Sequence, residues 1–193
     1  MPKFKIGVYG SAGGESETVK AALKAEKIGR QIALGGHIVI TGACPGLPYA
    51  AAEAAYQARG VVWGSSPFHD KKENSRFYPD EDPKIYKKLF FIPKSFKLGR
   101  DLEISRKYRN VVSTGTSDAG IIMAGRWGTM HEFCSLHDYG RVIGVLNNSG
   151  AFANELPRLL KKISKKTKAK IIFQSNPVKL VDLVVRELRR RKS

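Results

Sequence analysis

Three short glycine-bearing turns, each set between an apolar run and a helix-forming segment, constrain the fold of this chain more than any other feature. They read GSAGG at residues 10–14, TGACPG at 41–46 and GRWGT at 125–129. Strand, tight turn and helix form the unit that builds parallel sheets, because each helix returns the chain across the sheet in a right-handed crossover. The repeated unit predicts an α/β fold, Rossmann-like and doubly wound, with a mainly parallel sheet in a three-layer αβα arrangement.

Hydrophobic periodicity places these elements along the chain, which we expect to form one domain over residues 1–193. A continuous apolar run such as AGIIMA at 119–124 indicates a buried strand. Residues 65–84 show neither period, so we expect a long polar loop there, either a functional lid or simply a mobile connection. The expected strands are 4–9, 37–40, 61–64, 85–92, 119–124, 142–146 and 170–174, and the expected helices are 16–34, 47–59, 99–114, 151–165, 176–191 and one that opens at Gly128 and Thr129.

The three turns follow strands, so they share the carboxyl edge of the expected sheet, where ligands bind in such folds. The third turn leads into a helix whose first N–H groups lack helical partners and attract anions. None of the turns is GxGxxG, and the chain has no GxxxxGK[ST] loop, which argues against a dinucleotide or ATP-hydrolysing site. We therefore expect a pocket for a nucleotide-like phosphate, with Gly128 and Thr129 as its best phosphate-binding residues.

The charge of the chain is strongly positive, at +17, and it is unevenly spread. Residues 151–193 hold thirteen basic and three acidic residues, a net charge of +10. Such a segment attracts anions and permits non-specific contacts with nucleic acid. It lacks interleaved aromatic residues that would stack on bases, so a solvated basic face is the preferred interpretation and nucleic acid is a possible but not favoured partner.

Other classes of protein are disfavoured by the composition. No run approaches the eighteen or so apolar residues that cross a bilayer, and the N-terminus has no secretory segment, so we expect a cytoplasmic protein that does not contact membranes. Cys44 and Cys134 have neither CxxC nor zinc-ligand spacing. His131 and His137 would not share a helix face, so no metal site is expected.

The residues of the turns resemble the signatures of a known family. AGRWGTMHE at 124–132 is similar to the PGGxGTxxE motif of the LOG family, the cytokinin riboside 5′-monophosphate phosphoribohydrolases once called lysine decarboxylases. TGACPGLP at 41–48 resembles the family's TGGGPGxM, and SAGG at 11–14 resembles its SSG-like first loop. The similarity spans roughly residues 4–147. It implies a nucleotide-binding homodimer that needs no metal or organic cofactor.

The resemblance also implies a reaction, the hydrolysis of the N-glycosidic bond of a purine nucleoside 5′-monophosphate such as AMP or an N6-modified AMP. Glu132 would stabilise an oxocarbenium-like transition state and activate water. Arg109, fifteen residues before the motif's proline position, would hold the nucleotide or stabilise the leaving base. The further candidate ligand-binding residues are Gly125, Arg126, Gly128, Thr129, Ser11, Gly13, Thr41, Gly42 and Gly46.

Simpler interpretations exist for each of these residues. Thr129 and Glu132 have the spacing of a capping box, in which the glutamate only bonds to the main chain at the start of the helix. Arg109 could be a solvated helix residue, and the glycines could serve turn geometry alone. Arg100, Arg106 and Lys107 could serve the site or a dimer interface, with a surface role as the preferred interpretation. Cys44 is expected to be a small packing residue.

Departures from the family motif keep other functions open. Ala124 replaces the proline, and Arg126 replaces the second glycine. If residue 126 requires a left-handed backbone, arginine costs about 1–2 kcal/mol there. Its guanidinium could grip a phosphate or fill the space of a ribose. The alternatives are a non-catalytic carrier or sensor of a nucleotide or of the molybdenum cofactor, and a nucleic-acid interaction protein similar to the DNA-processing proteins of the wider superfamily.

Overall fold

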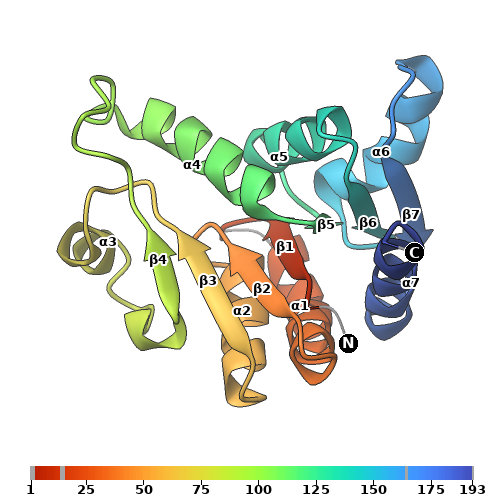
Figure 1. The fold of residues 1–193 in the computed structure, drawn as a ribbon, viewed down its shortest axis with the longest axis horizontal. Helices are drawn as coiled ribbons and strands as arrows, with labels where there is room; N and C mark the ends of the chain where they lie inside the picture. The colour runs from red at the N-terminus through yellow and green to blue at the C-terminus, as the bar shows by residue number, and fades with distance from the viewer. Residues whose placement is uncertain (1–2, 14–15, 164, 193) are drawn as a thin grey trace.

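A seven-stranded, fully parallel sheet forms the centre of the computed structural model, which describes residues 3–13, 16–163 and 165–192 (Figure 1). The strand order is β4-β3-β2-β1-β5-β6-β7. The strands are β1 Lys5–Gly10, β2 Ile38–Thr41, β3 Val61–Ser65, β4 Lys88–Phe90, β5 Ala119–Met123, β6 Val142–Leu146 and β7 Lys170–Gln174. The helices are α1 Ser16–Leu34, α2 Leu47–Gln57, α3 Lys71–Phe77, the 3-10 turn η1 Pro83–Ile85, α4 Leu102–Thr116, α5 Trp127–Asp138, α6 Ala151–Lys162 and α7 Pro177–Arg190.

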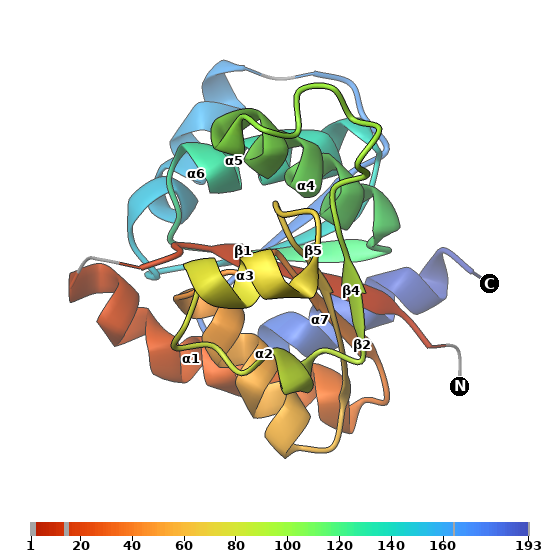
Figure 2. The ribbon, with the colours of Figure 1, turned by 90° about the vertical axis from the view of Figure 1, so that its left-hand side faces the viewer.

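Two helix layers cover the sheet. Figure 2 shows α1, α2 and α7 below it and α4, α5 and α6 above it. The expected doubly wound α/β fold is therefore confirmed. Within the described residues, no helix has both the length and the apolar character needed to cross a membrane.

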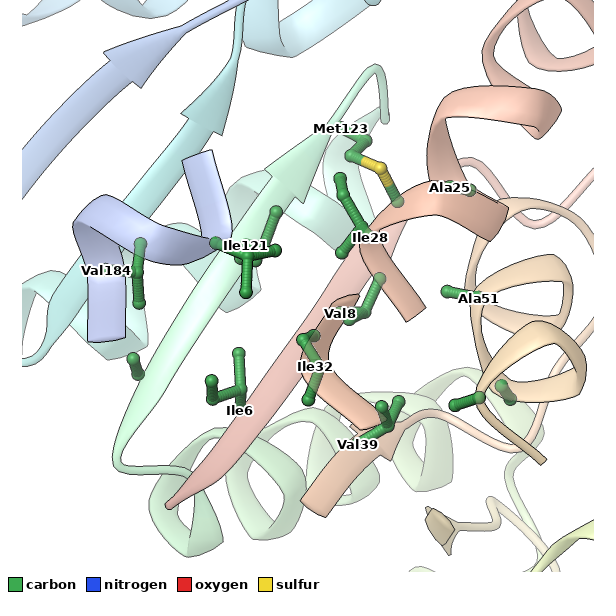
Figure 3. Packing of buried hydrophobic residues seen from close by; sticks show 14 of the residues in the cluster. Ile6, Val8, Ala25, Ile28, Ile32, Val39, Ala51, Ile121, Met123 and Val184 are labelled. Carbon is green, nitrogen blue, oxygen red and sulfur yellow. The ribbon is translucent and has the colours of Figure 1, made fainter. Parts of the chain in front are cut away.

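Alternation along β1 divides the core between the two faces of the sheet. Ile6 and Val8 pack in the cluster that holds Ile28 and Ile32 of α1 (Figure 3). Tyr9 points to the opposite face, where it packs in a second cluster with residues of α5 and α6. Full burial of an isoleucine side chain stabilises the fold by about 1.5–3 kcal/mol, so these alternating contacts fix which face of each strand meets which helix.

The prediction that residues 65–84 form a loop without regular structure was wrong, because the segment contains the short helix α3 and the start of the turn η1. Asp70 caps α3, its carboxylate accepting a hydrogen bond from the N–H of Glu73 at 2.9 Å. Seven residues are too few to show a helical period, so only the cap could have marked this helix. The expected strand at 85–92 is correspondingly shorter, since pairing with β3 is limited to Lys88–Phe90.

The strand order places a topological switch point between β1 and β5. The chain adds β2, β3 and β4 on one side of β1, and then returns to add β5, β6 and β7 on the other. Crossovers on the two sides run to opposite faces of the sheet, which opens a crevice beyond the carboxyl ends of the central strands. The three glycine turns follow β1, β2 and β5, so they meet at this crevice.

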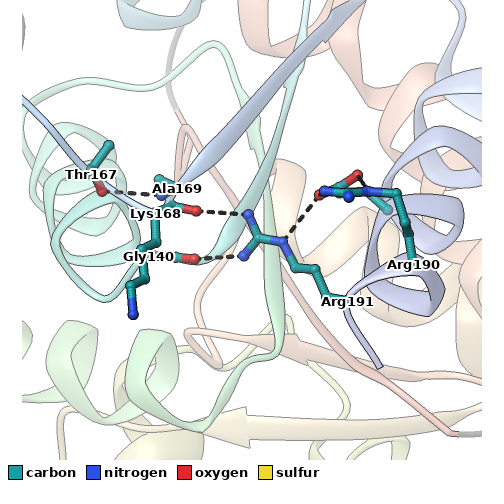
Figure 4. Close-up of polar contacts among 7 residues, drawn as sticks. Gly140, Thr167, Lys168, Ala169, Arg190 and Arg191 are labelled. Atoms are coloured by element: carbon teal, nitrogen blue, oxygen red, sulfur yellow. Dashed lines mark hydrogen bonds and ion pairs between the residues drawn. The ribbon is translucent and has the colours of Figure 1, made fainter. Parts of the chain in front are cut away.

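Arg191, at the end of α7, binds main-chain groups that precede strands β6 and β7, at the end of the sheet opposite the glycine turns (Figure 4). The guanidinium of Arg191 donates to the carbonyls of Gly140 and Lys168, both at 2.7 Å. It also pairs with Glu187 one turn back in α7. One basic residue therefore joins α7, the turn before β6 and the segment before β7.

Candidate functional site

A cavity of about 600 Å³ lies at the switch point between α4, α5 and the carboxyl ends of β1 and β2. This volume falls within the range of small-molecule sites. Its walls come from the glycine turns, the start of α5, one side of α4, and Tyr78 after α3. The lining residues are Val8, Tyr9, Gly10, Ser11, Ala12, Gly42, Cys44, Pro45, Pro48, Tyr78, Glu103, Arg106, Lys107, Arg109, Asn110, Arg126, Trp127, Gly128, Thr129 and Glu132.

The turn before α5 presents the helix N-terminus to this cavity. Gly125 has a φ of 89°, and its N–H donates to the Ser11 hydroxyl at 3.0 Å. The first intrahelical bond runs from Met130 N to Arg126 O at 2.9 Å, so the amides just before Met130 have no carbonyl four residues back within the helix. These amides and the helix dipole favour an anion at this end of α5.

The backbone of Arg126 differs from the strained conformation considered above. Its φ of −127° lies outside the left-handed region, so arginine is not strained there. The positive φ angles of this turn belong instead to Ala124, at 44°, and to Gly125. Proline cannot adopt the φ of Ala124, so this backbone could not accommodate the proline of the motif at that position. The Arg126 side chain is exposed, and the cavity beside it stays open.

Glu132 is not the glutamate of a capping box. Helix α5 begins at Trp127 and has Arg126 as its N-cap residue, so Thr129 lies inside the helix rather than at its cap. No hydrogen bond of the Glu132 carboxylate occurs among the described residues, and the residue is 7% exposed. Burial raises the pKa of the Glu132 carboxyl to about 7, although Arg109 and Lys107 act to lower it.

Arg109 lies in the interior, unlike a typical surface arginine, and faces the same cavity. Its Nη1 donates to the Gly42 carbonyl at 2.6 Å and lies 3.6 Å from the Cys44 sulfur. Its Nε is buried without a partner among the described residues. Burial alone would lower the pKa of Arg109, but Cys44 and Glu132 raise it above its usual value, so the guanidinium stays charged. Burial raises the pKa of the Cys44 thiol, which suits a packing residue better than a nucleophile.

The structure brings together seven of the expected site residues around the cavity: Ser11, Gly42, Arg109, Arg126, Gly128, Thr129 and Glu132. Thr41, Gly13, Gly46 and Gly125 do not line it, and they shape the turns instead. Thr41 accepts a hydrogen bond from Ala43 N at 3.3 Å, and a side chain on Gly46 would meet the Ser11 carbonyl at 2.4 Å.

Several lining residues escaped the sequence interpretation. Arg106 and Lys107, expected on the surface, line the cavity beside Arg109, as do Asn110 and Trp127. The signal was present in α4, whose buried positions Ser105, Arg109, Asn110, Ser113 and Thr114 are all polar. A helix that turns a polar side inward covers either a polar network or a ligand. Among the described residues, no group of three potential metal-ligating side chains occurs.

Comparisons with known proteins agree with this architecture. The model of a family described as the SLOG cluster4 family matches residues 3–181. No match was found among curated proteins. The structure of TM1055, a structural genomics target, has a TM-score of 0.78 at 16% identity and covers 95% of this chain and 99% of that one.

Two further solved structures share the fold. The molybdenum cofactor binding protein of the phototrophic bacterium Rippkaea orientalis has a TM-score of 0.71 at 21% identity, covering 97% of this chain and 99% of that one. DNA processing protein A of Helicobacter pylori, described with a single-stranded DNA binding mode, has a TM-score of 0.61 at 19% identity. The match covers 95% of this chain and 81% of that one. At these identities the likeness establishes the fold alone.

Proposed function

The chain belongs to the SLOG cluster4 family, and from that membership and the geometry of its cavity we propose that it hydrolyses nucleoside 5′-monophosphates. The products are a free purine base and ribose 5-phosphate. AMP or an N6-modified AMP is the proposed substrate, and no metal or organic cofactor takes part. The proposal extends the resemblance of residues 124–132 to the LOG motif.

The observation that carries this proposal is the Glu132 carboxyl, buried in an open cavity beside Arg109 with a pKa of about 7. A carboxyl whose pKa lies near neutrality can exchange protons at physiological pH. A buried carboxyl in a cleft with a strongly raised pKa is a candidate for function.

In the proposed reaction, one group of residues binds the phosphate and Glu132 acts on the sugar. The amides at Gly128 and Thr129 bind the 5′-phosphate, while Arg106 and Lys107 add positive charge to the wall. Water attacks C1′ as the bond from C1′ to the base nitrogen breaks. Ionised Glu132 accepts a proton from that water and stabilises the positive charge on the sugar, and the departing base takes up a proton from solvent.

Release of adenine from AMP tests the proposal directly. We expect turnover by the intact chain, and a loss of about 10²-fold or more in kcat for Glu132→Gln, with AMP affinity retained because the phosphate contacts persist. Glu155→Gln is the matched control, since Glu155 is an exposed glutamate on α6 that does not line the cavity. It should leave kcat unchanged. Absence of turnover with every purine monophosphate tested, with binding retained, would contradict the proposal.

A non-catalytic carrier is the second candidate function. Its support is the likeness to molybdenum cofactor binding proteins and the exposed Trp127 at the cavity rim, which offers a planar surface to a pterin-type ring. A carrier would bind its ligand tightly and release it unchanged.

The third candidate function is binding of single-stranded nucleic acid. The likeness to DNA processing protein A and the basic C-terminal segment support it. Retention of an oligonucleotide at about 200 mM salt tests this candidate.

We also propose that the protein is a homodimer, as the LOG resemblance implies. An apolar groove of about 210 Å³ between α5 and α6 is lined by Leu159, Leu160 and the exposed Ile163, and it offers a surface for self-association. Light scattering should then give twice the chain mass of 21.3 kDa.

A further inference from the structure

A second buried carboxyl, which the proposed reaction does not use, lies in the segment that closes one side of the cavity. This wall segment, residues 78–85, follows α3 and leads toward the edge strand β4 (Figure 1). Its first residue, Tyr78, lines the cavity. The N–H of Glu81 donates to the Tyr78 carbonyl at 3.3 Å. Glu81 therefore shares one turn with the residue that faces the cavity, so that a movement of this turn displaces both.

The surroundings of Glu81 suit a neutral carboxyl and not a carboxylate. The residue is 8% exposed, and neither of its side-chain oxygens has a hydrogen-bond partner among the described residues. Burial raises the pKa values of Cys44, Tyr49 and Tyr86, and the charge of Glu81 adds to each of these shifts. A thiol and two phenols with raised pKa values are uncharged at neutral pH, so they bring no positive charge to Glu81.

No cation compensates for this burial. The charged residues around the wall segment are the exposed Asp80, Asp82, Lys84 and Glu53 of α2, and the buried Arg109 on the cavity side. Burial is the only cause of the shift that raises the pKa of Glu81, to about 7, so neither Lys84 nor Arg109 offsets it. An ionised carboxylate that is buried without a partner is strongly unfavourable, and it becomes favourable again only in contact with water.

The contacts that hold the wall segment are local. The N–H of Asp82 donates to the Tyr49 hydroxyl of α2 at 2.9 Å, and Ile85 anchors the end of the segment in the core. Pro79 and Asp80 are exposed between the cavity-facing residue and Glu81. A short surface segment held in this way can open while the central sheet stays folded. Opening the segment is therefore the least disruptive way for Glu81 to reach water.

We propose that Glu81 is a pH-dependent switch of the cavity wall: its neutral carboxyl keeps the wall segment docked on α2, and its ionisation releases the segment and opens the cavity beside Tyr78. The inference depends neither on the identity of the ligand nor on the proposed reaction. In the open state the carboxyl is solvated and has the ordinary pKa of a glutamate. Each rise of one pH unit from that value to about 7 therefore favours the open state by up to about tenfold, and the effect levels off above it.

Hydrogen exchange of backbone amides in the intact chain, corrected for the intrinsic exchange rate at each pH, tests this inference. The reporters are the Asp82 amide, which bonds to Tyr49, and the Tyr78 amide, which donates to the Asn74 carbonyl at 2.9 Å. Amides of β1 serve as the internal reference for global unfolding. Relative to β1, protection of both reporters should fall by at least about tenfold between about pH 5 and about pH 7.5.

Substitutions at position 81 separate the carboxyl from other titrating groups. Glu81→Gln should keep the reporters protected over the whole range, because its side chain does not ionise. Glu81→Met, which is also uncharged and of similar length, takes its place if the glutamine variant does not fold. Asp80→Asn is the matched control, since Asp80 is an exposed carboxylate in the same turn. It should retain the fall in protection that the unsubstituted protein shows.

Three results would overturn the inference. The first is a protection of the reporters that does not change with pH in the unsubstituted protein. The second is a fall that persists in a folded Glu81 variant, which would assign the titration to another group. The third is a response of the Asp82 amide without the Tyr78 amide, because the switch would then not reach the cavity. None of these results bears on whether adenine is released from AMP, which tests the proposed function separately.

Discussion

At the scale of single residues, the contact between Arg109 and Gly42 organises the site. The hydrogen bond from Nη1 to the Gly42 carbonyl joins residues 67 positions apart and holds the guanidinium against the turn after β2. A side-chain carbon on Gly42 would lie 1.5 Å from that nitrogen, so only glycine leaves room for it. The absence of a side chain at Gly42 therefore makes room for the arginine.

Gly42→Ala should displace Arg109 and lower kcat/KM for AMP by at least about tenfold, because the guanidinium would lose its position beside Glu132. The fold should persist, since the added methyl group meets a side chain rather than backbone. Steady-state kinetics and circular dichroism check this expectation. Gly115→Ala is the control, because a side chain there would meet no neighbouring atom. Unchanged kinetics in Gly42→Ala would contradict the assigned position of Arg109.

The titration of Glu132 sets the expected pH dependence of the reaction. Its pKa is raised to about 7, and the ionised form is the one that accepts a proton from water. The value of kcat/KM should therefore rise with pH and level off above pH 7 or so, with an apparent pKa near that of the carboxyl. A rate profile over the neutral range measures this, and a rate that falls as pH rises would argue that the protonated form acts instead.

At the scale of elements, the segment from α3 to β4 forms one wall of the cavity through Tyr78 and fastens itself to α2. The Tyr49 hydroxyl accepts a hydrogen bond from Asp82 N at 2.9 Å. Glu81, which directly precedes Asp82, is 8% exposed. Neither of its carboxylate oxygens has a hydrogen-bond partner in the residues that the structure describes. Burial raises the pKa of Glu81 to about 7, so this wall holds an ionisable group where charge is unfavourable.

Glu81→Gln should stabilise the protein at pH 8 and have little effect at pH 4.5. The folded state holds the Glu81 proton more tightly than the unfolded chain, so the free energy of unfolding falls as pH rises from about 4.5 to 7. Glutamine removes this loss, which we place at about 1–3 kcal/mol. Denaturant unfolding at both pH values measures the difference in free energy of unfolding between the variant and the unsubstituted protein. The similar titration of Glu132 occurs in both proteins, so it cancels from this difference. An equal effect at both pH values would contradict the explanation.

At the scale of the whole molecule, the basic C-terminal segment both supports the sheet edge and adds to the positive charge of the chain. Arg191 joins α7 to the segments that flank β6 and β7 through two carbonyls and Glu187. We expect this large positive charge to concentrate anions around the molecule and so to speed capture of the proposed substrate.

Arg191→Ala should lower the free energy of unfolding by about 1–3 kcal/mol, because it removes two charge-assisted hydrogen bonds that close the sheet edge. AMP turnover below the melting temperature should be unchanged, since Arg191 does not line the cavity. Arg186→Ala is the control for loss of charge, because Arg186 is an exposed residue of α7. Equal destabilisation by the two variants would show that charge, and not these contacts, is responsible.

The sequence by itself determined the fold and the edge of the sheet at which the candidate site lies. Strands and helices follow from apolar periods that neighbouring residues set locally, and glycine turns after parallel strands meet at one edge whatever the details of packing. The same local signals failed for α3, which is shorter than an amphipathic period, and for the start of α5, where no side-chain cap marks the first residue.

Only the tertiary structure decided which polar groups meet. Arg109 and Gly42 lie far apart in the chain, and both their contact and the cavity that they share with Glu132 depend on how α4 packs over the central strands. The pKa of Glu132, the unpaired oxygens of Glu81 and the left-handed backbone at Ala124 likewise follow from burial and packing. Burial and hydrogen bonding are properties of the assembled fold, because they depend on neighbours that the linear order of residues does not specify.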